Sequence, residues 1–112
     1  MRSKAELSLL LDYYGGFLTE RRRELMRMSA DEDMSLSEIA EVAGVSRQSV
    51  RDSIVKGGDE LMRYEQQLGL IGRDRALRGI ADMLADAKGL DSAEELKKTV
   101  GLASERLNAL IK

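Results

Sequence analysis

The segment SLSEIAEVAGVSRQSV, residues 35–50, constrains the local fold more strongly than any other part of the chain. Ser35 and Glu38 have the spacing of a capping box, in which each side chain accepts a backbone N–H at the start of a helix. Gly44 follows that helix, and glycine adopts the positive φ of a tight turn at little cost. Ser46 can cap a second helix directly after the turn. The segment therefore predicts a helix-turn-helix.

The apolar side chains of this region have the spacing needed to pack its two helices together. Val50 and Ile54 lie one turn apart on the second helix, and Ala40 is small where the helices cross. The outward positions of the second helix are Arg47, Gln48, Arg51, Asp52, Val55 and Lys56. Arg and Lys suit phosphate groups, while Arg and Gln can form paired hydrogen bonds to guanine and adenine. This arc is the candidate nucleic-acid-binding surface.

The charge of the chain opposes that interpretation at first sight. The sequence contains 18 Lys and Arg against 20 Asp and Glu, a net charge of −2, whereas domains that bind duplex DNA are normally basic. The arc from Arg47 to Lys56 nevertheless holds three basic side chains and one acidic one. The alternative is a protein-interaction adaptor that keeps the helix-turn-helix as a scaffold. Acidic residues of the loop at 31–33 would favour the adaptor if they covered the second helix.

Composition argues against catalysis and against a metal or cofactor site. The chain has no cysteine and no histidine, so it lacks thiol nucleophiles, the commonest general base and the commonest transition-metal ligand. We therefore expect no enzyme activity, no catalytic residue, no metal and no cofactor. No apolar run reaches membrane-spanning length, and the amino-terminal segment becomes acidic too early for a signal peptide. A cytoplasmic protein with no membrane partner is expected.

The rest of the sequence also predicts helices, because it contains no proline and is rich in Leu, Ala, Glu, Arg and Met. The first helix is expected to end at Gly15 and Gly16, a pair that can adopt left-handed backbone angles. Asp91 and Glu94 form a second candidate capping box. Glycines at 68–74 mark the clearest boundary. The predicted helices besides the one after Ser35 cover about residues 4–14, 20–30, 47–68, 73–88 and 92 to the end.

An apolar seam continues beyond the helix-turn-helix with a spacing of four and three residues: Val50, Ile54, Gly57, Leu61, Tyr64, Leu68 and Ile71. Two glycines inside a helix cost about 2 kcal/mol relative to alanine, so Gly57-Gly58 either permits a close helix contact or hinges two shorter helices. Two amphipathic faces follow in the tail, Leu77 to Leu84 and Leu96 to Leu110. Together these surfaces exceed what a small core can cover, so we expect a homodimer. A groove for a partner's helix is the alternative for the tail.

Residues 18–54, from LTERRRELM to RQSVRDSI, resemble the promoter-binding region 4 of bacterial sigma factors. With the flanking DYYGGFLTERRR and YEQQLGL, the chain is similar over about residues 5–71 to the YlxM family of small bacterial helix-turn-helix proteins. Genes of that family commonly neighbour those of the signal recognition particle, which implies a regulatory part in that pathway. The resemblance matches Ser46, Arg47, Gln48, Ser49, Arg51 and Asp52 to the start of the recognition helix. Gly57-Gly58 departs from the sigma pattern.

The sequence as a whole predicts an all-α protein with two parts. Residues 1–71 are expected to form a sigma-region-4-like helix-turn-helix bundle with a long fourth helix. Residues 72–112 are expected to form a carboxy-terminal helical hairpin that packs on the bundle or on a second subunit. The predicted function is regulatory nucleic-acid binding, with DNA as the expected partner, RNA as the alternative, and components of the signal recognition particle as further candidates.

Overall fold

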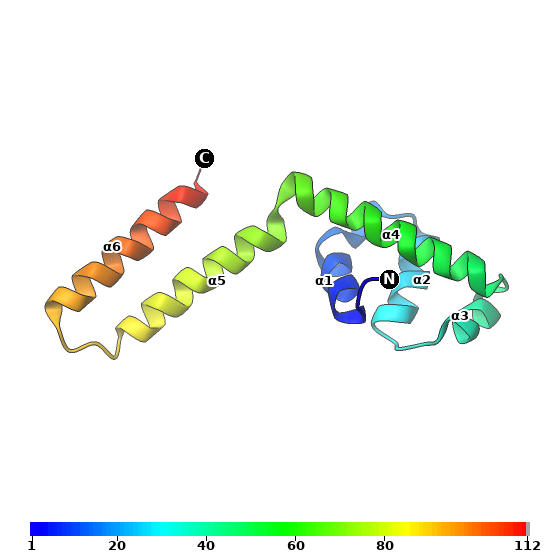
Figure 1. The fold of residues 1–112 in the computed structure, drawn as a ribbon, viewed down its shortest axis with the longest axis horizontal. Helices are drawn as coiled ribbons and strands as arrows, with labels where there is room; N and C mark the ends of the chain where they lie inside the picture. The colour runs from blue at the N-terminus through cyan, green and yellow to red at the C-terminus, as the bar shows by residue number, and fades with distance from the viewer. Residues whose placement is uncertain (112) are drawn as a thin grey trace. The chain divides into compact units, whose positions relative to one another are not determined.

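The computed structural model describes residues 1–111, which form α-helices and one short 3-10 helix and contain no strand (Figure 1). The all-α prediction is confirmed. The chain divides into two compact units, Met1–Gly69 and the residues from Leu70 onward. The elements are α1 (Lys4–Tyr14), the 3-10 helix (Gly15–Phe17), α2 (Glu20–Ala30), α3 (Leu36–Ala43), α4 (Arg47–Leu68), α5 (Leu70–Ala87) and α6 (Ala93–Leu110).

The helix-turn-helix signals of the sequence are all present in α3 and α4. The Glu38 N–H donates to Ser35 Oγ, and the Ser35 N–H donates to Glu38 Oε1, each at 3.1 Å. These bonds, the backbone one above all, lower the pKa of Glu38. Gly44 ends α3 with φ 69°, in the left-handed region, and Ser46 Oγ accepts the Ser49 N–H at 3.0 Å. Local chemistry therefore fixes both ends of the turn.

Helix α1 ends at Gly15 as predicted, although not with left-handed angles, and two other local predictions are wrong by small amounts. Gly15 has φ −57°, because a 3-10 turn closed by the Leu18 N–H on the Gly15 carbonyl ends α1 without a left-handed residue. Helix α6 is capped by Ser92, one residue after the predicted Asp91, since both positions have a glutamate three residues later. Helix α5 begins three residues earlier than expected, because Gly69 alone, with φ 64°, ends α4.

The core of the first unit lies between α4 and the three helices that precede it (Figure 1). Val50, Ile54 and Leu61 are fully buried, so most of the predicted seam faces helices of its own unit. The ring centroid of Tyr64 lies 5.1 Å from that of Phe17. Along α4, the seam becomes open to solvent only at Leu68, whose exposed fraction is 54%. The seam therefore cannot be the large uncovered surface that the sequence indicated.

Helix α4 continues through Gly57-Gly58, so the hinge alternative is wrong. Both glycines are buried where α2 and α1 contact α4. A Cβ at Gly57 would lie 2.3 Å from Met26 Sδ and 3.2 Å from Arg22 Cδ. A Cβ at Gly58 would lie 3.1 Å from Leu7 Cδ2. The missing side chains therefore permit two neighbouring helices to approach α4 closely.

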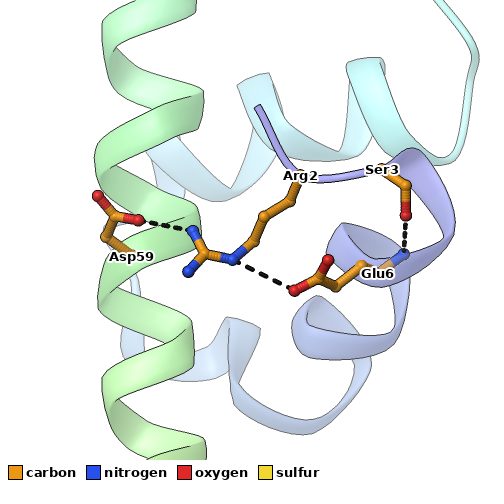
Figure 2. A network of polar contacts seen from close by, with 4 residues as sticks. All are labelled: Arg2, Ser3, Glu6 and Asp59. Atoms are coloured by element: carbon orange, nitrogen blue, oxygen red, sulfur yellow. Dashed lines mark hydrogen bonds and ion pairs between the residues drawn. The ribbon is translucent and has the colours of Figure 1, made fainter.

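Polar contacts also hold α1 against α4. In Figure 2, the Arg2 guanidinium lies between two carboxylates, 2.6 Å from Asp59 on α4 and 3.3 Å from Glu6 on α1. Ser3 caps α1 by accepting the Glu6 N–H at 3.1 Å. Nearer the other end of α4, the Tyr14 hydroxyl donates to Glu65 at 2.5 Å. These contacts join the two helices along most of their shared length.

In the second unit, α5 and α6 lie side by side and run in opposite directions (Figure 1). Ile80, Ala87 and Ala103 are buried, and Arg106 donates to Met83 Sδ at 3.2 Å. Large apolar side chains of both helices are exposed: Leu70, Leu77, Leu84, Val100, Leu102 and Leu107. This hairpin thus has a small core for the amount of apolar surface it carries.

Replacing Gly57 with alanine should destabilise the first unit by about 1–2 kcal/mol, because overpacking against Met26 outweighs the better helix propensity of alanine. Gly79 of α5 is the control, since a Cβ there meets nothing within 4 Å. Gly79→Ala should stabilise by about 0.5–1 kcal/mol. Thermal unfolding followed by circular dichroism measures both. Equal stabilisation by the two substitutions would contradict the close contact.

Replacing Gly44 with valine should destabilise the helix-turn-helix by about 1–3 kcal/mol, because a β-branched residue is strained at φ 69°. Gly44→Asn should be better tolerated, since asparagine adopts left-handed backbone angles more readily. Chemical denaturation of the three proteins gives the comparison. A valine variant as stable as the asparagine variant would show that backbone strain does not govern this position.

Candidate nucleic-acid interface

The predicted binding residues lie at the start of α4 and are exposed to solvent. They are Ser46, Arg47, Gln48, Ser49, Arg51, Asp52 and Lys56. Ser46 has a structural role as well, because its hydroxyl is the N-cap of α4. The other side chains project from a helix whose opposite face is buried, so the backbone of α4 holds them in fixed relative positions.

The outermost line of α4 is polar apart from Val55. Gln48, Asp52, Val55 and Asp59 follow one another at spacings of four, three and four residues, on the side opposite the buried face of the helix. The Gln48 side-chain amide donates to Asp52 Oδ1 at 2.9 Å. An amide can pair with adenine and a carboxylate can accept from the cytosine amino group. The chemistry of this line therefore suits the edges of bases.

Basic side chains flank that line on both sides. Arg47 and Arg51 are one turn apart on one side, and Lys56 lies on the other. When a helix enters the major groove, its outer line faces bases and its flanks face the phosphates of the two strands. The distribution of charge around α4 has this arrangement.

A concave surface lies along the Lys56 side of α4. It is lined by Arg22, Ser46, Gln48, Ser49, Asp52, Ser53 and Lys56. The structure thus brings most of the predicted residues into one groove, whereas Arg47 and Arg51 lie outside it. The sequence did not point to Arg22, from α2, or to Ser53. Arg22 is within the LTERRRELM motif, but its position beside α4 depends on the close contact at Gly57.

The acidic loop between α2 and α3 makes its contacts with α1 and α2. The Ser8 hydroxyl donates to Asp31 at 2.6 Å, and Arg27 lies 3.6 Å from the same carboxylate. Lys4 forms an ion pair and a hydrogen bond with Asp33. The hydrogen bond, and then the positive charge of Lys4, lower the pKa of Asp33. These contacts direct both carboxylates toward the amino-terminal helices.

A metal site needs a cluster of ligating side chains, and membrane insertion needs a long apolar helix. Within residues 1–111, no group of three or more Asp, Glu, His or Cys side chains is arranged to hold a metal ion. The helices in the same range include none that is long and apolar enough to cross a membrane.

Comparison with known proteins identifies the family. A family model described as "Putative helix-turn-helix protein, YlxM / p13 like" matches residues 1–100. The chain belongs to this family. The resemblance found in DYYGGFLTERRR and YEQQLGL is confirmed, and the match extends past the helix-turn-helix unit into the carboxy-terminal hairpin.

Relatives in the family match over nearly their full length. A UPF0122 protein of Symbiobacterium thermophilum is 39% identical over 109 residues, which cover 97% of this chain and 100% of the relative. A UPF0122 protein of Desulforamulus reducens is 33% identical over 111 residues, covering 96% and 95%. A UPF0122 protein of Clostridium perfringens is 34% identical over 113 residues, covering 99% and 98%. Both units of the chain are therefore shared with the family.

Proposed function

We propose that this chain is a cytoplasmic, non-catalytic regulator that binds duplex DNA with the first half of α4. The observation that carries the proposal is the exposed polar line of α4, Gln48 and Asp52, flanked by Arg47 and Arg51 on one side and Lys56 on the other. The contacts of Asp31 and Asp33 with the amino-terminal helices support it. Membership of a helix-turn-helix family supports the same class of ligand.

The proposed binding is local and depends on salt. Because the whole chain carries a net charge of −2, affinity has to come from the few cations beside the recognition helix. Arg47, Arg51 and Lys56 give three phosphate contacts in each protomer. In a dimer the contacts double, and the slope of log K against log salt approaches about −5 on B-form DNA. Binding is then modest and falls steeply as salt rises.

The regulatory context we propose is the signal recognition particle pathway, on the strength of the family resemblance. The RNA and protein components of that particle are then the alternative partners to DNA. Duplex DNA is preferred because an exposed helix with a polar outer line fits a major groove, while the major groove of A-form RNA is too narrow for it.

We further propose that the protein is a homodimer joined through the second unit. Leu77 and Leu84 on α5, and Val100 and Leu107 on α6, repeat at seven-residue intervals and are exposed. The first half of α5 is net basic, with Arg73, Arg75 and Arg78 against Asp74, and its second half carries Asp82 and Asp86. Antiparallel pairing with a second copy would therefore oppose unlike charges. A two-fold dimer would also suit paired half-sites on DNA.

Gln48→Ala should reduce the preference for one duplex sequence over another and leave the salt slope nearly unchanged, because the amide faces bases. Lys56→Ala should weaken all sequences alike and reduce the slope by about 1 for each phosphate that the lysine neutralises. Arg63→Ala is the control, since Arg63 is exposed on the same helix but lies beyond the candidate surface. Titrations at 50 and 200 mM salt, with duplex DNA and with signal recognition particle RNA, measure these effects.

If the chain binds the RNA and not the duplex DNA, RNA replaces DNA as the proposed ligand. Absence of binding to either nucleic acid at low salt, or binding that is indifferent to both Gln48→Ala and Lys56→Ala, would reject the proposal and favour the protein-interaction adaptor.

Light scattering should give about twice the 12.5 kDa chain mass at tens of micromolar protein. Leu77→Asp and Leu84→Asp should each shift the dimer toward monomer, because a charge would be buried at the interface. Val42→Asp is the matched control: Val42 is an apolar residue of α3 that is 66% exposed, and its substitution should leave the mass unchanged. A monomer mass for the unmodified chain would reject the dimer.

A further inference from the structure

The groove beside α4 is lined by groups that donate hydrogen bonds. Arg22 and Lys56 are cationic, and Ser49 and Ser53 offer hydroxyl groups. Asp52 is the one carboxylate among the lining residues, and it already accepts a hydrogen bond from Gln48. Two cations, two hydroxyls and a partly satisfied carboxylate suit an anion with several oxygen atoms, such as a phosphodiester.

Arg22 reaches this groove from α2, outside the helix-turn-helix. The absence of a side chain at Gly57 leaves room for its methylene stem, since a Cβ there would lie 3.2 Å from Arg22 Cδ. Its Nε donates to Ser53 Oγ at 3.4 Å. That contact uses one of the five N–H donors of the guanidinium. Packing and a hydrogen bond therefore hold the Arg22 side chain along the flank of α4 that carries Lys56.

We propose that Arg22 supplies a phosphate contact from outside the helix-turn-helix, so that the α2–α4 groove holds the backbone of one strand. This inference rests on the proposed DNA binding. Arg47 and Arg51 lie on the opposite flank of α4 and would face the other strand. Each flank of the recognition helix then carries two cations. The outer line with Gln48 lies between them.

The position of Arg22 assigns it to phosphate and not to bases. Its partner Ser53 is half-buried, next to the core-facing side of α4, while the outer line with Gln48 faces away from the core. A guanidinium held there borders the recognition helix. Its effect on affinity should therefore be independent of base sequence, and it should appear in the salt slope.

The test compares Arg22→Met with Arg21→Met in the full-length chain. Methionine retains an apolar stem beside Gly57 and removes the charge. Arg21 is the adjacent arginine; it is exposed and does not line the groove. Each variant is titrated with a preferred duplex and a scrambled duplex at several salt concentrations. Arg22→Met should weaken both duplexes about tenfold at 0.1 M salt and reduce the slope by about 0.9 for each phosphate that Arg22 neutralises, while Arg21→Met changes neither.

A third variant separates charge from packing. Arg22→Lys retains the cation, so it should restore the salt slope even if Arg22→Met lowers the melting temperature. Equal effects of Arg22→Met and Arg21→Met would overturn the inference and leave the proposed DNA binding intact. A loss of affinity for the preferred duplex alone would also overturn it, by showing a base contact. Failure of the unmodified chain to bind any duplex would reject both proposals together.

Discussion

The close contact at Gly57-Gly58 is the constraint on which the first unit depends. Without Cβ atoms at these positions, α2 and α1 approach the middle of α4, and Met26 and Leu7 occupy the space. The glycines weaken the intrinsic helix propensity of α4, and the core packed around them compensates. The same contact places the stem of Arg22 beside α4. One packing solution therefore stabilises the bundle and shapes the groove beside the recognition helix.

Helix α4 has two chemically different faces, and the proposed nucleic-acid binding by a mildly acidic chain depends on this division. One face is fully apolar at Val50, Ile54 and Leu61. The other carries the exposed polar and basic side chains that begin at Arg47. Because salt screens charges that lie more than about 10 Å apart, the local arrangement around α4 matters more than the net charge of the chain. Asp33, for example, is paired with Lys4 and not with a cation of α4.

The sequence predicted features that depend on neighbouring residues, and it failed where distant segments meet. The capping box at Ser35 and the left-handed turn at Gly44 follow from local hydrogen bonding and backbone freedom. The family was also evident from local motifs. In contrast, periodicity could not show that the α4 seam is covered by its own unit, because that depends on three-dimensional packing. Arg22 was missed for the same reason, since only the fold brings α2 beside Ser53.

The aromatic residues are distributed unevenly. All three tyrosines and the single phenylalanine belong to the first unit, and the chain has no tryptophan. Tyr14, Tyr64 and Phe17 are in contact around the end of α4. Ultraviolet absorbance and intrinsic fluorescence therefore report on the helix-turn-helix unit alone, whereas far-ultraviolet circular dichroism reports on both units. Comparing the two optical signals during unfolding would show whether the hairpin melts with the helix-turn-helix unit or as a separate cooperative element.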